Sequence, residues 1–203
     1  MIAILDYGAG NLFSVKNALN YIGESSIITS DVKEIERADA LILPGVGAFP
    51  DAMKKLHDCG MVSAIKQAVE KKPLLGICLG MQALFETGME FSKTQGLGLI
   101  PGTVDLIRFP QGQTKKLPHI GWNQLEIRQP SELLKGLRDG DCVYFVHSYM
   151  AYTDSQYIAA EGEYGAQITA FVQNGNVYGA QFHPEKSGEV GLEILKNFGG
   201  LVK

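Results

Sequence analysis

Short, wholly apolar segments alternate with amphipathic ones along the first eighty or so residues, and this alternation constrains the fold more than any other feature. An apolar run that shows no polar alternation indicates a strand buried on both faces. Leu12, Val15 and Leu19 recur at helical spacing between Asn11, a good N-cap, and Gly23. Strand, helix and strand in this order predict right-handed crossovers and a parallel sheet. The predicted strands are Ile2–Tyr7, Ser26–Thr29, Ala40–Leu43 and Leu74–Ile77, and further helices are predicted over Met61–Lys71 and Met81–Thr87.

The pattern changes after Gly96, where predicted strands follow one another with turn residues between them. Asn174-Gly175 separates two of them and is a hairpin signal. A last helix is predicted over Val190–Phe198. We therefore expect one α/β domain over residues 1–203, with a mixed, mostly parallel central sheet flanked by helices and additional antiparallel strands in the C-terminal half. Those later strands are Thr103–Phe109, Gln124–Ile127, Cys142–Val146, Tyr157–Ala160, Ile168–Val172 and Val177–Phe182.

Composition excludes several classes of function. The formal net charge is −4, which gives no electrostatic footprint for a nucleic-acid binder. No apolar run approaches the about 18 residues of a membrane span, and no signal peptide is visible, so we expect a soluble, cytoplasmic protein. The three cysteines are widely spaced, which argues against a disulfide framework. The four histidines have no metal-ligand spacing, and no phosphate loop or dinucleotide fingerprint is present, so we expect neither metal nor cofactor.

One cysteine lies in a sequence typical of a nucleophile. Gly76-Ile77-Cys78-Leu79-Gly80 stands where a buried strand must turn at once into a helix. This is the G-x-S-x-G nucleophile elbow with cysteine in place of serine. The amides and the positive dipole end of the following helix would favour the reactive thiolate at Cys78. A buried core cysteine is the ordinary alternative, but the spacing at a strand–helix junction favours the nucleophile.

A thiolate nucleophile needs a base and a group that orients the base. The strand Val177–Phe182 runs into His183-Pro184-Glu185, and Pro184 favours an extended backbone at His183. Residues 183 and 185 then lie on roughly one side, so Glu185 could hold one imidazole nitrogen while the other faces Cys78. His147 is the competing candidate for the base, although no acidic residue lies two positions away from it.

Taken together, these residues resemble the class I, or triad, glutamine amidotransferases. The elbow followed by Met81-Gln82 and the distal His183-Pro184-Glu185 are that family's two hallmarks, in its order. Within the family, the chain is most similar to the glutaminase subunits that serve histidine biosynthesis. The segments that carry this closer resemblance are Asp6-Tyr7-Gly8-Ala9-Gly10-Asn11, Pro44-Gly45-Val46-Gly47-Ala48-Phe49, Pro118-His119-Ile120-Gly121-Trp122-Asn123 and His147-Ser148-Tyr149.

The resemblance implies an activity and a set of site residues. Cys78 would attack the side-chain amide of glutamine, and His183, oriented by Glu185, would protonate the leaving ammonia and then activate water against the thioester. The backbone N–H of Leu79, with a second donor from the segment around Gly45 and Val46, would form the oxyanion hole. The residues implied to hold glutamine are Gln82, Glu90, Ser148 and Tyr149.

Val46 raises a particular expectation about the oxyanion hole. Many relatives have Gly-Gly where this chain has Gly45-Val46. Turning the Val46 N–H into the site would require a peptide flip that gives Val46 a positive φ, which strains a β-branched residue by about 1–3 kcal/mol. We therefore hypothesise that the hole is not formed at rest and that the free subunit is nearly inactive.

The resemblance also implies a partner. In the histidine pathway a (β/α)8-barrel cyclase docks over the glutaminase site, takes up the ammonia and converts the nucleotide PRFAR into imidazole glycerol phosphate and AICAR. Asn11, Trp122 and Lys186 are implied as interface residues in such a heterodimer. Three alternatives stay open: a glutaminase subunit of another pathway (pyridoxal phosphate, aminodeoxychorismate or GMP synthesis), a stand-alone cysteine hydrolase or peptidase, and a non-catalytic binding module.

Overall fold

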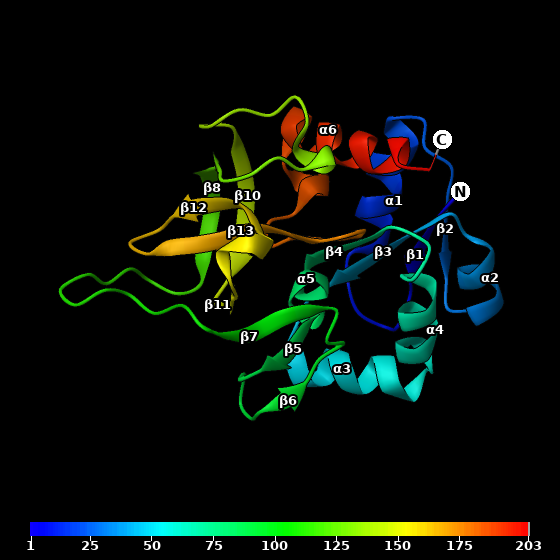
Figure 1. Ribbon diagram of the computed structural model, residues 1–203, viewed down its shortest axis with the longest axis horizontal. Helices are drawn as coiled ribbons and strands as arrows, with labels where there is room; N and C mark the ends of the chain where they lie inside the picture. Colours follow the sequence, from blue (N-terminus) through cyan, green and yellow to red (C-terminus); the bar gives the residue numbers. More distant parts are fainter. Residues whose placement is uncertain (203) are drawn as a thin grey trace.

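A mixed sheet of eight strands runs through the middle of the molecule, in the order β2-β1-β3-β4-β14-β13-β12-β9 (Figure 1). The computed structural model describes residues 1–202. Strands β2 to β14 of this order are parallel, and β13, β12 and β9 extend the sheet in antiparallel fashion. The strands are β1 (Ile2–Leu5), β2 (Ser26–Thr29), β3 (Ala40–Gly45), β4 (Leu74–Cys78), β9 (Glu126–Ile127), β12 (Ile158–Glu163), β13 (Gln167–Asn174) and β14 (Val177–Ala180).

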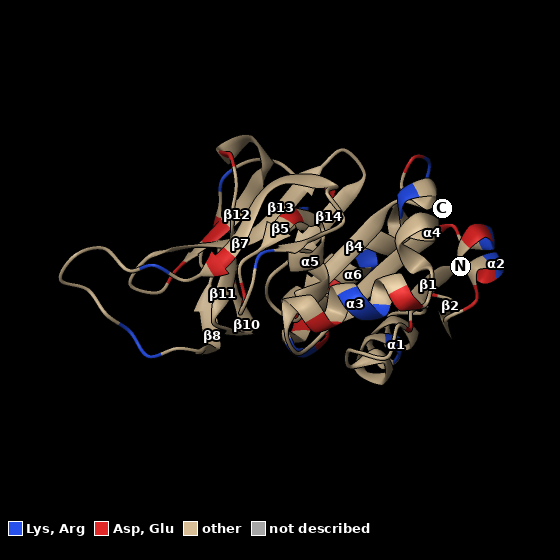
Figure 2. Ribbon diagram, turned by 90° about the horizontal axis from the view of Figure 1, so that it is seen from below, with Lys and Arg blue, Asp and Glu red and all other residues tan. Residues whose placement is uncertain are grey.

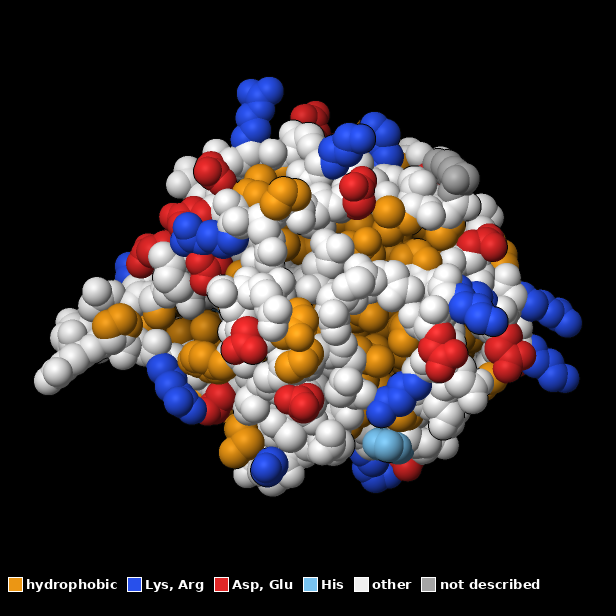
Figure 3. Space-filling model, viewed as in Figure 1, with side chains coloured by type: hydrophobic (Ala, Val, Ile, Leu, Met, Phe, Trp, Pro, Cys, Tyr) orange, Lys and Arg blue, Asp and Glu red, His pale blue; other side chains and the backbone are white. Residues whose placement is uncertain are grey.

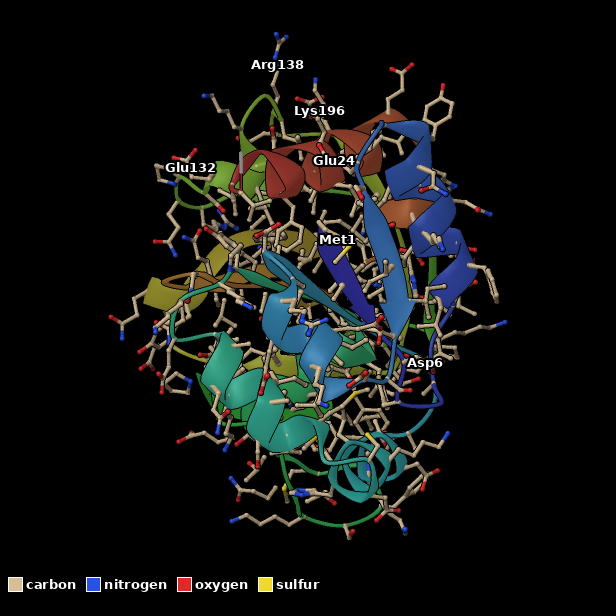
Figure 4. The ribbon with its side chains drawn as sticks, turned by 90° about the vertical axis from the view of Figure 1, so that its right-hand side faces the viewer. Met1, Asp6, Glu24, Glu132, Arg138 and Lys196 are labelled. Atoms are coloured by element: carbon tan, nitrogen blue, oxygen red, sulfur yellow. The ribbon has the colours of Figure 1, made fainter. Side chains whose placement is uncertain are left out.

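Helices cover both faces of the parallel part, which explains its apolar strands. Helices α1 (Leu12–Tyr21) and α6 (Gly188–Gly200) pack on one face, against Ile2 and Ile4 of β1. The intervening residues of β1 point to the opposite face, where α2 (Val32–Arg37), α3 (Phe49–Asp58) and α4 (Met61–Ala68) cover them. Figure 4 shows this layering from the side, with α1 and α6 on one side of the strands and Asp6 at the end of β1.

Two smaller sheets stand beside the central one. The first has the order β11-β7-β5-β6, and the second pairs β10 with β8. The chain between β7 and β8, residues 107–118, projects from the molecule as a long loop that carries basic residues (Figure 2). The strands are β5 (Phe85–Gly88), β6 (Thr94–Gln95), β7 (Ile100–Leu106), β8 (His119–Gln124), β10 (Cys142–His147) and β11 (Tyr149–Tyr152). Three short 3-10 helices complete the chain: η1 (Glu132–Leu134), η2 (Ser155–Tyr157) and η3 (Pro184–Lys186).

The mixed α/β architecture expected from the sequence is confirmed, but several local predictions were wrong or incomplete. The helix predicted over Met81–Thr87 ends at Ala83, because the next residues form β5 and pair in parallel with β7. The strand predicted over Gln124–Ile127 begins at His119 instead and is interrupted at Leu125, so it forms β8 and β9. Helices α2 and α3 were not predicted at all.

Strand β14 joins the two parts of the sheet, and we call its pairing with β4 the β4–β14 seam. It pairs in parallel with β4, with Ala180 opposite Ile77, and antiparallel with β13. The predicted hairpin between β13 and β14 is confirmed, with its two turn residues at Gly175 and Asn176 rather than at 174 and 175. Because β4 and β14 run in the same direction, the chain segments that leave their carboxyl ends emerge side by side.

Charged side chains are spread over the surface, and the described helices can be compared with the length of a membrane span. Positive and negative side chains are interspersed with small apolar areas on the face seen in Figure 3. Along residues 1–202, every helix is too short or too polar to cross a bilayer.

Candidate active site

The turn from β4 into helix α5 (Leu79–Ala83) places Cys78 in a strained position. Cys78 has a φ of +54°, a conformation rare for a residue with a side chain, and its residue is only 7% exposed. The flanking glycines make the turn feasible. A Cβ on Gly80 would lie 1.7 Å from the carbonyl oxygen of Leu43, and one on Gly76 would lie 2.7 Å from that of Gly80. The elbow predicted from the sequence is therefore present.

His183 follows β14 and so lies at the same edge of the sheet as Cys78. Its backbone N–H donates to the carbonyl oxygen of Tyr144, 2.9 Å away. Its Nδ1 atom lies 2.8 Å from Oε1 of Glu185, and the two side chains are only 3% and 1% exposed. The structure thus brings the imidazole and the carboxylate together in the dry pair expected from the His-Pro-Glu sequence.

The charge balance of His183 is set by its two neighbours. Burial by itself lowers the pKa of the imidazole, but the hydrogen bonds and negative charges of Cys78 and Glu185 outweigh burial and raise the pKa to about 9. Cys78 and Glu185 thus both favour the protonated form of this imidazole.

The sulfur opens onto a cavity of about 320 Å³. This volume suits a ligand of amino-acid size, and the cavity lies at the carboxyl ends of the parallel strands, where α/β proteins bind ligands. Eight of the residues proposed for catalysis or glutamine binding meet there, and Gly47, Pro118 and Val146 also line it without a predicted role in the site. The eight are Val46, Cys78, Leu79, Gln82, Glu90, Ser148, Tyr149 and His183.

His147 also lines the cavity, but both of its ring nitrogens are engaged elsewhere. Nδ1 lies 2.9 Å from the carbonyl oxygen of Tyr149, and Nε2 lies 3.1 Å from Nδ1 of His119. Burial, the largest cause in each case, lowers the pKa of both histidines to about 4. A neutral imidazole with both nitrogens occupied cannot take a proton from Cys78, so the geometry favours His183 as the base.

Residues around the entrance of the cavity have local structural roles as well. One carboxylate oxygen of Glu90 accepts a 2.7 Å hydrogen bond from the backbone N–H of Phe49, at the start of α3.

The segment Gly45-Val46, proposed for the oxyanion hole, lies next to Cys78. Val46 is 49% exposed, and its φ is not positive. Gly45 is tightly enclosed, because a Cβ there would lie 2.6 Å from the hydroxyl oxygen of Tyr7. Burial, with a smaller contribution from the Cys78 charge, raises the pKa of that Tyr7 hydroxyl.

The three residues proposed for a partner interface lie outside the cavity lining. Asn11 caps α1, since its side-chain oxygen accepts from the backbone N–H of Ser14. Trp122 is 58% exposed on β8 and meets the ring of Tyr144 edge-on. Lys186 is exposed in η3, directly after Glu185. Within the described part of the chain, no three His, Cys, Asp or Glu side chains cluster as metal ligands would.

Comparison with known proteins gives a consistent result. A family model described as glutamine amidotransferase class-I matches residues 3–200. A curated protein named imidazole glycerol phosphate synthase subunit HisH, from Caldanaerobacter subterraneus subsp. tengcongensis, is 54% identical, with 100% of this chain and 99% of that protein covered. A protein of the same name from Bacillus cereus is 52% identical, with 100% and 96% covered.

Solved structures share the fold at lower sequence identity. One described as glutamine amidotransferase has a TM-score of 0.75 at 22% identity and covers 98% of each chain. Another, described as PurLQS from Thermotoga maritima, has a TM-score of 0.73 at 20% identity and covers 100% of this chain and 98% of that one.

Proposed function

The chain belongs to the class I glutamine amidotransferase family, and on that premise we propose that Cys78, His183 and Glu185 hydrolyse glutamine to glutamate and ammonia. The protein is the glutaminase subunit of an imidazole glycerol phosphate synthase and acts in histidine biosynthesis. The observation that carries the proposal for the three residues is that a strained, buried cysteine and a buried histidine meet at one cavity, with Glu185 against the far side of that histidine.

The reaction begins with attack of the Cys78 sulfur on the amide carbon of glutamine. A tetrahedral intermediate forms, and its oxygen carries the negative charge. His183, whose pKa is raised to about 9, gives its proton to the leaving nitrogen, so that the C–N bond breaks and ammonia departs. The neutral imidazole then takes a proton from water, whose oxygen attacks the thioester. Breakage of the C–S bond releases glutamate and restores the Cys78 sulfur.

Glu185 acts through His183. Its Oε1 lies 2.8 Å from Nδ1, so it fixes the ring with Nε2 available on the other side. Its negative charge also contributes to the raised pKa of the imidazole. A carboxylate in this position stabilises the imidazolium that transfers the proton.

Gln82 and Glu90 hold the substrate with the atoms that the protein leaves free. The amide nitrogen of Gln82 already donates to the carbonyl oxygen of Tyr149 at 2.9 Å and to Oε1 of Gln181 at 3.0 Å. Only the Gln82 oxygen remains for the ligand, so Gln82 accepts from an N–H group of glutamine. Glu90, Ser148 and Tyr149 line the same cavity and complete the binding site.

The oxyanion hole consists of the Leu79 N–H and a donor from Gly45-Val46. Val46 has an ordinary negative φ, which supports the hypothesis that the second donor is turned away at rest. Flipping this peptide would strain Val46 by about 1–3 kcal/mol. In Val46→Gly that strain is absent, so we expect glutamate release by the free subunit to rise about tenfold. An unchanged rate would contradict the gating hypothesis.

Ammonia must pass to a second subunit, because in water it would be protonated and lost as a nucleophile. We assign that role to a (β/α)8-barrel cyclase, which would convert PRFAR into imidazole glycerol phosphate and AICAR. The exposed Trp122 and Lys186, with the partly buried Asn11, form the proposed contact surface. Aromatic and basic side chains are common anchors in protein interfaces.

Glutamate release tests the function directly. The purified chain is mixed with a candidate barrel cyclase, with and without the nucleotide substrate, and a glutamine-like affinity reagent is used to label the nucleophile. We expect the partner and nucleotide to stimulate glutamate release, and we expect labelling of Cys78 that is lost in Cys78→Ser. No stimulation by any such cyclase would overturn the pathway, while activity on peptides or esters without glutamine would favour a stand-alone hydrolase.

A further inference from the structure

We infer that Gln181 is a further catalytic residue, whose side-chain amide donates a hydrogen bond to the sulfur of Cys78. Gln181 directly follows β14 and is 0% exposed. Its Nε2 atom lies 3.8 Å from Sγ of Cys78, within the range of a hydrogen bond to sulfur. The inference rests on the proposed role of Cys78 as nucleophile and adds a contact to the reacting atom that the three proposed residues do not provide.

The orientation of the Gln181 amide follows from a chain of contacts that starts at a backbone carbonyl. The carbonyl oxygen of Tyr149 can only accept, so the Gln82 atom 2.9 Å away must be the amide nitrogen. The same nitrogen lies 3.0 Å from Gln181, which must therefore present its oxygen to Gln82. The Gln181 NH₂ group is left on the other side, where it faces the sulfur. The direction of this donor is thus determined by the network and does not depend on a choice between amide flips.

A second chain of contacts holds the same Tyr149 carbonyl from the other side. Asn123 donates through Nδ2 to the carbonyl oxygen of Glu163 at 2.7 Å, and the same nitrogen lies 3.4 Å from Nε2 of His119, which must then accept. His119 donates through Nδ1 to His147, and His147 donates through Nδ1 to Tyr149. Every ring nitrogen is matched when both histidines are neutral. His147 and Gln82 thus fix one carbonyl together and act as positioning residues for Gln181.

A donor at this place favours the thiolate at both chemical steps. Hydrogen bonds to a charged acceptor are stronger than those to a neutral one. The sulfur carries negative charge before it attacks the amide carbon and again when it leaves the thioester, but it is neutral in the thioester itself. The Gln181 N–H therefore helps the sulfur both as nucleophile and as leaving group, without taking up or losing a proton.

The test measures the reactivity of Cys78 without glutamine. Gln181→Met has nearly the same length and volume but no donor, and we expect its Cys78 to react with iodoacetamide at pH 7 about tenfold more slowly than in the native chain. Gln181→Glu keeps an acceptor for Gln82 but places a carboxylate against the sulfur, so we expect a larger loss. Mass spectrometry of the digested protein gives the rate for each cysteine separately, and the exposed Cys59 and Cys142 serve as internal references.

Gln173→Met is the matched control. Gln173 is a glutamine on the neighbouring strand β13 whose amide binds the carbonyl oxygen of Gly175, and it does not line the cavity. We expect it to leave the rate at which Cys78 reacts with iodoacetamide unchanged. The inference is overturned if Cys78 in Gln181→Glu, or in a folded Gln181→Met, reacts with iodoacetamide at a rate within twofold of the native one. Because alkylation needs no turnover, that result leaves the glutaminase assignment intact. Absent glutamate release in the native complex would overturn the assignment and with it the catalytic role of Gln181, while the alkylation rates would still report the hydrogen bond to the sulfur.

Discussion

The two sides of the β4–β14 seam position their functional groups in different ways. On the β4 side, Cys78 is placed by its immediate neighbours in the sequence, since five consecutive residues make the strand end, the strained turn and the helix start. On the β14 side, His183 is placed by the register of β14 against β4 and by a hydrogen bond to Tyr144, which is distant in the sequence. The position of Cys78 thus follows from local sequence, whereas the position of His183 depends on tertiary structure.

The same difference extends to electrostatics. The three histidines with shifted pKa values, His119, His147 and His183, all lie in the C-terminal half of the chain. The local elbow contributes sterically constrained glycines instead, with a Cβ on Gly80 excluded by Leu43. Substitutions in the elbow should therefore change the backbone geometry around Cys78. Substitutions near the three histidines should change how activity and stability depend on pH.

The largest expected effect is the loss of chemistry in Cys78→Ala. Removal of the sulfur leaves only binding and the oxyanion hole, so glutamate release by the complex should fall about 10⁴-fold or more. Thermal unfolding should stay close to that of the native chain, because alanine fits the same buried space. Retention of more than a tenth of the rate would mean that another residue attacks glutamine. Cys142→Ala, a change at an exposed cysteine, is the control.

Gly80→Ala tests the local construction. Its new Cβ would meet the Leu43 carbonyl oxygen at 1.7 Å, so β3 and α5 would have to separate. We expect a loss of about 3 kcal/mol or more in the free energy of unfolding, measured by urea denaturation. Gly200→Ala, in α6 with nothing within 4 Å of the added Cβ, should change it by less than about 0.5 kcal/mol. Equal effects of the two substitutions would refute the steric account of the elbow.

Glu185→Gln tests the tertiary side. The amide keeps a hydrogen-bonding atom near Nδ1 but removes the charge, so we expect kcat to fall about 10²-fold. The pKa of His183, about 9 in the native chain, should fall, as NMR titration would show. Because this pKa is raised on folding, its contribution to stability is complete below the unfolded value of about 6.5 and is lost as the pH rises through 9. If the pKa of His183 is the same in Glu185→Gln as in the native chain, the Glu185 carboxylate is not a cause of its raised value.

The neutral histidine pair gives an effect of opposite sign, and replacement of one of the two histidines gives the smallest expected effect. The pKa values of His119 and His147 are lowered to about 4 on folding. Their contribution to the free energy of unfolding is therefore complete above pH 6.5, the value of about 6.5 being the unfolded pKa, and is lost as the pH falls toward 4. We expect about 2 kcal/mol per histidine over that interval. His119→Phe preserves a ring between Phe145 and Tyr164 and should flatten the acid side of the stability curve. If the free energy of unfolding of His119→Phe falls with acid pH as steeply as that of the native chain, the histidine pair is not the source of the acid dependence.

The sequence contained the local half of the site but not the tertiary half. Gly76, Cys78 and Gly80 could be interpreted from spacing alone, because a strand–helix turn follows from short-range sterics. The His-Pro-Glu pattern predicted His183 as the partner of Cys78 but left His147 as a competing base, since no pattern specifies that β14 pairs with β4. Gln181 was missed although it lies two residues before His183 and so on the same side of an extended chain, which was the available signal. The β5 strand was missed because Met81–Thr87 begins as a helix and is redirected by pairing with the distant β7.

The central claim is that Cys78 and His183 work as one unit across the seam, and a double-mutant cycle on glutamate release tests it most directly. Cys78→Ala, His183→Gln and the double variant are compared in the complex with the cyclase. If the two residues form one unit, the double variant is no slower than the slower single variant, because each substitution alone disables the same step. If the two losses multiply, the residues act independently and the account is wrong.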